Sequence, residues 1–234
     1  MLQAIRITLS AYTASFRVPH FVGHQLTLPV PPLSTVYGLI SAAAGRWIMP
    51  QEVEWLAYRC EYEAKAFDLE AIVQIERKKP ESAARPKAPP KTRGISQREF
   101  LARPRLTLYL PLDWEAAFRR PRYALLLGRT QDVATVESIQ KVDLKPVPEG
   151  EVSGVLLPFE LLGRGRSSAW LHNLPVAFTE GPDRRPLRLQ IFGAVDAFRP
   201  AEVRNAEGWL VQDVKDGTTI PLYRKEWVLA VNTS

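Results

Sequence analysis

A proline-led helix signal in the first fifth of the chain constrains the fold more than any other local feature. Segment 29–32 holds three prolines, which fix φ and disfavour helical backbone before Leu33. Apolar residues then recur at helical spacing, and Gly45 is placed to end the helix in the left-handed conformation. The sequence therefore predicts a helix from Ser34 to Gly45, with the Ser34 hydroxyl capping its first turn.

Gly38 lies inside this predicted helix. A glycine there costs about 1 kcal/mol relative to alanine, which suggests that something approaches the backbone closely. The plainer alternative is another helix or strand of the chain packed against it.

Four segments carry a family resemblance, and they occur in one order along residues 16–132. They read FRVP at 16–19, TLPVPPLSTVYG at 27–38, REFLARP at 98–104 and LGRTQD at 127–132. In this order they resemble CRISPR-associated protein 5, a RAMP-type subunit of type I Cascade surveillance complexes. Residues 146–234 carry no motif that matches.

The positive charge of the chain is concentrated in one segment. The net charge is +6, but residues 77–105 hold ten Lys and Arg against Glu81 and Glu99, so this segment carries 10 − 2 = +8 and the rest carries 6 − 8 = −2. A localised basic segment is typical of a protein that binds a polyanion, whereas the alternative is a solvated surface loop. Residues 78–94 lack large apolar side chains and cannot bury themselves.

Phosphate contacts suit this basic arm, because neutralised phosphates release counterions. The resemblance implies that the insertion, at about 78–97, is a thumb hairpin that reaches over the guide RNA. The candidate RNA-binding cations in or next to it are Lys78, Lys87, Lys91, Arg93 and Arg98.

Two glycine–arginine loops predict further anion sites. Arg129 follows Gly128 after an apolar run, and Arg164 and Arg166 alternate with glycines in segment 163–166. Backbone N–H groups beside a guanidinium can hold a phosphate, although each loop can equally be an ordinary turn.

The polar loop 10–28 carries the remaining candidates, Arg17 and His20, and Ser34 follows it. A metal-free ribonuclease needs a general acid and base near a 2′-hydroxyl, and Arg17, His20, His24 and Tyr37 are a possible set. The favoured interpretation is that the histidines contact RNA or each other. We therefore expect no catalytic residue, no metal ligand and no cofactor.

The order of predicted elements indicates an α+β fold. Alternating strands are predicted at 2–9, 60–67 and 105–110, and a hairpin turn at 68–70 leads into a strand at 71–77. Strand, helix, strand, strand begins a ferredoxin-like, RNA-recognition-type domain. We expect this domain, with its thumb insertion, at 1–145, followed by a β-rich C-terminal extension at 146–234, which includes a hairpin turn at 215–217.

The predicted function is non-catalytic. The resemblance implies a guide-RNA-binding subunit of a type I CRISPR surveillance complex, which holds the 5′ repeat-derived handle of the crRNA and caps the backbone filament. Its partners would be the crRNA, the backbone subunit and the large subunit, with target DNA close by. The alternatives are a metal-independent endoribonuclease that processes repeat RNA and an RNA-binding module unrelated to CRISPR.

The cellular setting follows from two composition features. Cys60 is the one cysteine, so no internal disulfide is possible, and this fits a reducing cytoplasm. No apolar run approaches the ~20 residues that a membrane span needs, so we expect no membrane partner.

Overall fold

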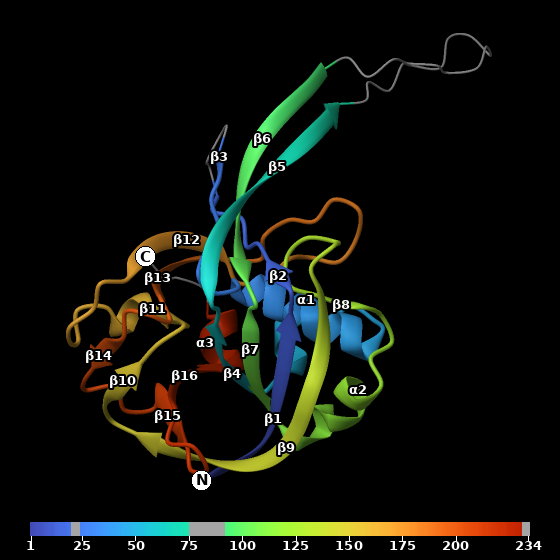
Figure 1. The fold of residues 1–234 in the computed structure, drawn as a ribbon. Coiled ribbons are helices and arrows are strands. Elements are labelled where there is room, and N and C mark those ends of the chain that lie inside the picture. The colour runs from blue at the N-terminus through green and yellow to red at the C-terminus, as the bar shows by residue number, and fades with distance from the viewer. Residues whose placement is uncertain (20–23, 75–91, 231–234) are drawn as a thin grey trace.

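The structure is a computed structural model that describes residues 1–19, 24–74 and 92–230. The fold is mostly β, with 48% strand and 15% helix. Six antiparallel strands close into a barrel (Figure 1). Around the ring they are β1 (Leu2–Ala11), β7 (Arg105–Leu110), β4 (Trp55–Glu61), β16 (Thr219–Arg224), β15 (Leu210–Asp213) and β9 (Val133–Val147), and β9 pairs again with β1.

The length of β9 explains how the ring closes. Its residues from Ala134 to Leu144 pair with β1, and those from Leu144 to Val147 pair with β15. The register on β1 shifts between Thr8 and Leu9, and such a bulge bends and twists a strand. One long strand therefore joins two parts of the sheet that an open arrangement would leave as edges. The short β8 (Leu125–Leu126) also pairs with β9.

The ferredoxin-like prediction is wrong, because the sheet is a closed barrel. The last quarter of the chain supplies β15 and β16, which complete the ring between β9 and β4. These strands therefore belong to the same sheet as β1, β7 and β4. A polar contact across the ring accompanies this closure: Asp213 on β15 is fully buried and accepts hydrogen bonds from Arg6 of β1 at 2.9 Å and Tyr109 of β7 at 3.1 Å.

Two apolar clusters lie on opposite faces of the ring strands. Leu9, Leu106 and Cys60 stand side by side on β1, β7 and β4 and belong to the cluster that also contains the buried side chains of α1 (Leu33–Ala44). Ala57 and Tyr109 face the other way and belong to the second cluster. The alternation predicted for β1 and β7 is therefore confirmed, but both faces of these strands are covered.

The helix prediction is confirmed, with two corrections. α1 ends at Gly45, which has φ 77° in the left-handed region. The N-cap residue is Pro32, with no side-chain capping bond, so Ser34 does not act as the cap. Gly38 is exposed, and a Cβ added to it would meet nothing within 4 Å in the described chain. The described residues therefore give no support to the alternative of a helix or strand of the chain packed against this glycine.

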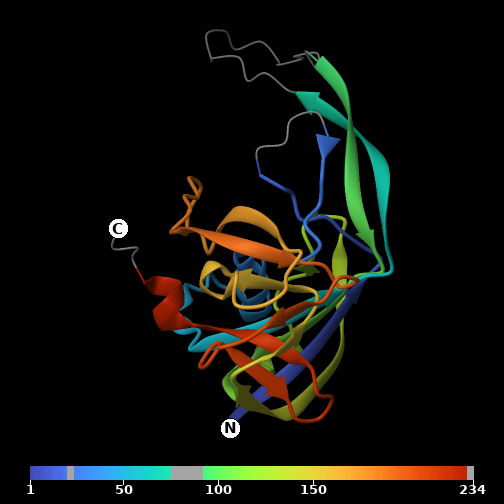
Figure 2. The same ribbon diagram turned by 90° about the vertical axis from the view of Figure 1, so that its left-hand side faces the viewer.

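A long two-stranded arm rises from the barrel (Figures 1 and 2). It consists of β5 (Ala64–Gln74) and β6 (Thr92–Ala102), which pair along their whole length. The hairpin turn predicted at 68–70 is therefore wrong, since β5 runs straight through it. Two short strands, β2 (Thr13–Ala14) and β3 (His24–Gln25), pair with β6 on its other side.

The remaining strands form two smaller sheets. A three-stranded sheet contains β11 (Val155–Pro158), β13 (Leu189–Val195) and β12 (Trp170–Pro175), and β10 (Gly150–Val152) pairs with β14 (Ala201–Val203). The hairpin turn predicted at 215–217 is confirmed between β15 and β16. The short helices are η1 (Pro50–Glu52), η2 (Leu112–Trp114), α2 (Glu115–Arg119), η3 (Phe159–Leu161) and α3 (Lys225–Leu229).

Candidate nucleic-acid interface

The β5–β6 arm has two unlike faces. Register places Lys65, Phe67 and Leu69 on one face, together with Ile95 of β6. Three of these are apolar side chains with exposed fractions of 56% for Phe67, 69% for Leu69 and 79% for Ile95. The opposite face carries Glu70 and its register partners on β6. One face of the arm therefore exposes Phe67, Leu69 and Ile95 among Lys65, Gln97 and Glu99, and the other, the polar face, carries Glu70 and Arg98.

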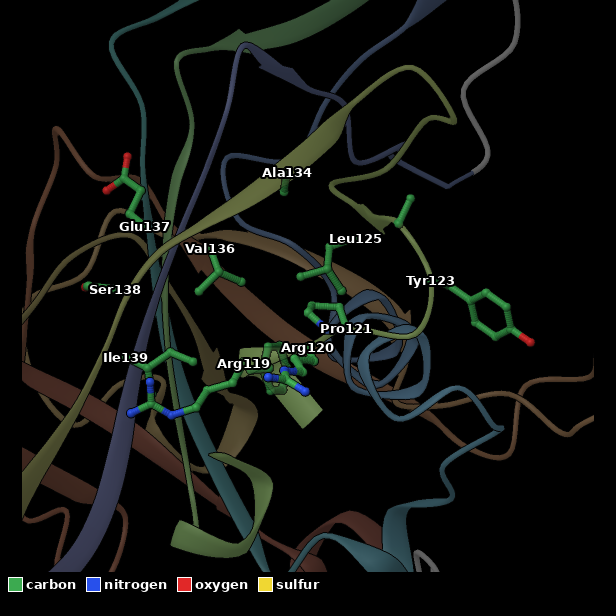
Figure 3. Close-up of a pocket in the computed structure, with 12 residues that line it drawn as sticks. Arg119, Arg120, Pro121, Tyr123, Leu125, Ala134, Val136, Glu137, Ser138 and Ile139 are labelled. Carbon is green, nitrogen blue, oxygen red and sulfur yellow. The ribbon is translucent and has the colours of Figure 1, made fainter. Parts of the chain in front are cut away.

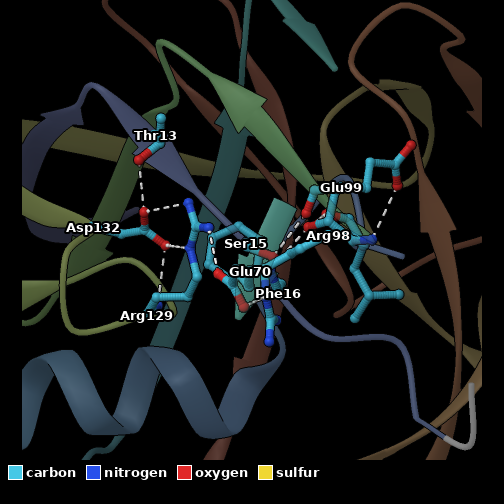
Figure 4. Close-up of polar contacts among 10 residues, drawn as sticks. Thr13, Ser15, Phe16, Glu70, Arg98, Glu99, Arg129 and Asp132 are labelled. Carbon is cyan, nitrogen blue, oxygen red and sulfur yellow. Dashed lines mark hydrogen bonds and ion pairs between the residues drawn. The ribbon is translucent and has the colours of Figure 1, made fainter. Parts of the chain in front are cut away.

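A polar network ties the polar face of the arm to the loop between β8 and β9 (Figure 4). Glu70 accepts hydrogen bonds from Arg98 at 2.5 Å and from Arg129 at 2.9 Å. Arg129 also forms a two-pronged pair with Asp132, with both N–O distances at 3.0 Å, and Thr13 donates to Asp132 at 2.6 Å. The network therefore connects β2, β5, β6 and the loop between β8 and β9.

Arg129 is enclosed by this network. Its side chain is 12% exposed, that of Asp132 is fully buried, and the guanidinium carbon lies 5.8 Å from the ring centre of Phe100. Burial opposes the charge of Arg129, but hydrogen bonds to Asp132 and Glu70 outweigh it and raise its pKa. In the protein alone this arginine is satisfied by carboxylates, so its geometry favours holding the arm over contacting RNA.

The predicted anion site at Gly128 is also occupied by the chain itself. The N–H of Arg129 donates to the Asp132 carboxylate at 3.0 Å. Gly128 has φ 108°, and a Cβ there would lie 2.1 Å from the Ser15 carbonyl oxygen. The glycine is therefore required by a close backbone approach, which the sequence alone could not separate from a phosphate-binding loop.

Arg17 lies on a narrow paired loop next to the arm. Its backbone bridges Thr27, and the neighbouring N–H of Phe16 donates to the Thr27 hydroxyl at 2.8 Å. Thr27 in turn donates its N–H to Glu99 of β6 at 3.0 Å. The Arg17 side chain is exposed, and so is His24 on β3. Arg17 therefore remains a candidate that the structure brings to the base of the arm, through its bridge to Thr27.

The second glycine–arginine loop packs along β14. The guanidinium of Arg164 donates to the carbonyl of Asn205 at 2.6 Å, and the carbonyl of Arg166 accepts from Glu202. A Cβ on Gly165 would meet the Glu202 carbonyl oxygen at 2.0 Å. Both arginine side chains are exposed, but the backbone carbonyls of both arginines accept hydrogen bonds from β14 and the residue after it.

The other candidates are placed as follows. Lys78, Lys87, Lys91 and His20 lie outside the described residues. Arg93 lies on β6 opposite Val73 in the register, and Ser34 is half-buried in the first turn of α1.

Tyr37, one of the residues considered as an acid or base of a ribonuclease, is buried. Tyr37 is 4% exposed and belongs to the apolar cluster around α1, where burial raises its pKa. A phenol in that position has no open path to an RNA 2′-hydroxyl.

A cavity of about 500 Å³ lies at the base of the arm, and sequence reasoning missed it. Its walls come from β5, β12 and the segment after β13, with Lys65, Trp170, His172 and Phe198 among them. The signal that could have found it is the pair Trp170 and His172, which alternate along one strand. Trp170 is 68% exposed.

A larger cavity, about 640 Å³, lies between α2 and β9 (Figure 3). Leu125 and Val136 border it, while Tyr123 points away. Of its two arginines, Arg119 donates to Glu115 at 2.8 Å, and Arg120 is exposed. The cavity is lined by residues between 118 and 139 and by none from the arm with its basic segment, so we regard the arm and its base as the stronger candidate interface.

Comparisons with known proteins find solved structures that share this fold. No family model and no curated protein matches the chain. A chain of a "CRISPR RNA-guided surveillance complex" is 16% identical, with 93% of this chain and 91% of that chain covered, and a TM-score of 0.52. A chain of the "Type III-B Cmr-beta bound to cognate target RNA" is 10% identical, with 85% and 86% covered, and a TM-score of 0.54.

These solved chains share the fold over nearly the whole length of this one. The resemblance to CRISPR-associated proteins that was noted in the sequence is thus confirmed at the level of the fold. No helix in the described ranges is both long and apolar enough to cross a membrane.

Proposed function

We propose that this protein is a non-catalytic, guide-RNA-binding subunit of a CRISPR surveillance complex, which holds the 5′ handle of the crRNA and lies at the end of the backbone filament. The observation that carries the proposal is the arm: the sequence between β5 and β6 holds six Lys and Arg against two acidic residues. A projecting, basic arm suits a single-stranded phosphate backbone. The fold likeness to chains of RNA-guided complexes supports the same function.

A salt titration tests the phosphate contacts. The triple variant Lys87→Ala, Lys91→Ala and Arg93→Ala should bind repeat-derived RNA more weakly and with a flatter dependence of log affinity on log salt. The expected change in slope is about 2, from roughly 0.7 per lost contact to single-stranded RNA.

The matched control removes the same charge from exposed cations elsewhere, in the variant Lys145→Ala, Arg185→Ala and Arg224→Ala. The control should keep the wild-type slope. Equal slopes for the wild type and the arm variant would show that the arm does not touch phosphate.

The non-catalytic part of the proposal has its own test. Repeat RNA incubated with the protein without metal should yield no product, and the burial of Tyr37 supports this expectation. Specific cleavage that His20→Ala abolishes would favour the endoribonuclease alternative.

A further inference from the structure

Two large aromatic side chains stand exposed around the cavity at the base of the arm. Trp170 is 68% exposed and Phe198 is 62% exposed, and both border the cavity of about 500 Å³. A volume of this size is within the usual range of small-ligand pockets. Exposed aromatic rings that gather at one concave site are typical of a binding surface, because each offers a face on which a planar ligand can stack.

The ring of Phe198 is held in place by the protein. Asp196 accepts a hydrogen bond from the Phe198 N–H at 3.0 Å and one from the Tyr62 hydroxyl at 2.7 Å. The Tyr62 ring packs edge-to-face against Phe198, with ring centres 5.2 Å apart. Tyr62 itself is 7% exposed, so the support is part of the core. A ring fixed in this way loses little conformational freedom when a ligand stacks on it.

His172 gives the cavity a polar group that can distinguish ligands. Trp170 and His172 alternate on β12 and therefore share the face that borders the cavity. Burial lowers the pKa of His172, which keeps the imidazole neutral near pH 7. A neutral imidazole has one donor and one acceptor, and this matches the hydrogen-bonding edge of a nucleobase.

The charges at the cavity are balanced rather than basic. Lys65 and Arg199 border it together with Glu99 and Asp196. Both carboxylates already accept hydrogen bonds from the chain, Glu99 from Thr27 and Asp196 from Tyr62 and Phe198. Such a site suits the flat, neutral part of a nucleotide better than a bare phosphate.

We propose that this cavity takes one unstacked nucleobase of single-stranded RNA, which stacks on Trp170 or Phe198 with its edge toward His172. The inference rests on the proposed function, since RNA must first reach the arm. Lys65 connects the two sites, because it borders the cavity and shares the exposed face of the arm with Phe67 and Leu69.

The test is RNA binding by the full chain, measured with a repeat-derived RNA and with copies that lack one base at a time. At least one of the variants Trp170→Ala and Phe198→Ala should weaken binding to the intact RNA by about 5- to 160-fold, the range for one lost base stack. Trp170→Phe keeps an aromatic ring for stacking, so it should lose less RNA affinity than Trp170→Ala. The matched control, Phe159→Ala, removes a 53% exposed aromatic outside the cavity and should stay within about 2-fold of the wild type.

The abasic RNAs identify the base. At one position of the RNA, removal of the base should weaken wild-type binding and abolish any further effect of the alanine variant that weakens binding to the intact RNA. An unchanged affinity for both alanine variants overturns the inference while leaving the proposed function intact. The same holds if the variants lose the same affinity on every abasic RNA. Wild-type protein that binds no RNA overturns both proposals.

Discussion

Replacement of Arg129 by alanine should destabilise the fold far more than it impairs RNA recognition. The change removes the two-pronged pair with Asp132, whose side chain is fully buried, and one of the two arginines that bind Glu70. Loss of one partner from a buried pair costs about 3–5 kcal/mol, because a charge is left buried without compensation. Thr13 and the backbone N–H of residue 129 still donate to Asp132, so we expect the lower end, about 3 kcal/mol.

Urea unfolding measures this loss directly. Arg129→Lys keeps the charge but loses the two-pronged geometry, and it should lie between the wild type and the alanine variant. Arg166→Ala is the matched control, since its side chain is exposed and its loss should change stability by no more than about 0.5 kcal/mol. At temperatures where Arg129→Ala remains folded, its preference for cognate over scrambled RNA should equal that of the wild type.

Two results would refute this reasoning. A stability loss below about 1 kcal/mol for Arg129→Ala would mean that the network does not hold the arm to the barrel. A normal stability together with a lost preference for cognate RNA would mean that Arg129 leaves its carboxylates and contacts the RNA.

Three further expectations follow from the structure. Desolvation opposes the charge of Glu70, but the hydrogen bonds from Arg98 and Arg129 outweigh it and lower the pKa of this carboxyl. The ionised Glu70 therefore stabilises the fold above its ordinary pKa of 4.5, and this stabilisation is lost as the pH falls through the lowered pKa of the folded state. The urea midpoints of the wild type and of Glu70→Gln should thus converge at acidic pH. Gly38→Ala should raise the free energy of unfolding by up to about 1 kcal/mol, since the added Cβ meets nothing within 4 Å in the described chain; a decrease would contradict this. A fragment of residues 1–147 should show no cooperative unfolding, because it lacks β15 and β16 and leaves β4 and β9 with open edges, whereas a cooperative melt would favour a separate N-terminal domain.

Local signals predicted the local structure well. The prolines before Leu33 and the glycine at position 45 restrict the backbone of only a few neighbouring residues, and α1 begins and ends where they indicate. The alternation in β1 and the turn at 215–217 are local in the same sense. These elements form because neighbouring residues impose them.

The barrel and the site depend on contacts that no local pattern contains. Leu222 of β16 pairs with Ala57 of β4 across most of the chain, and nothing near either residue predicts that partner. Arg129 is separated by 59 residues from Glu70, so the sequence showed an arginine after a glycine but not the carboxylates that enclose it. The sequence therefore predicted an RNA contact at a cation that, in the protein alone, is paired with two carboxylates.

The arm is a direct continuation of two adjacent barrel strands. β4 leads into β5, β6 leads into β7, and Glu61 pairs with Arg105 just below the arm. The N–H of Glu63 donates to Ala102 at 3.0 Å, so the pairing continues across the junction without a hinge loop. The Glu70 network then braces the polar face, and the opposite face, with Phe67 and Leu69, lies on the same side as the cavity, which Lys65 borders. A strand of RNA drawn along the arm by its phosphates would thereby be led to the aromatic rings at its base.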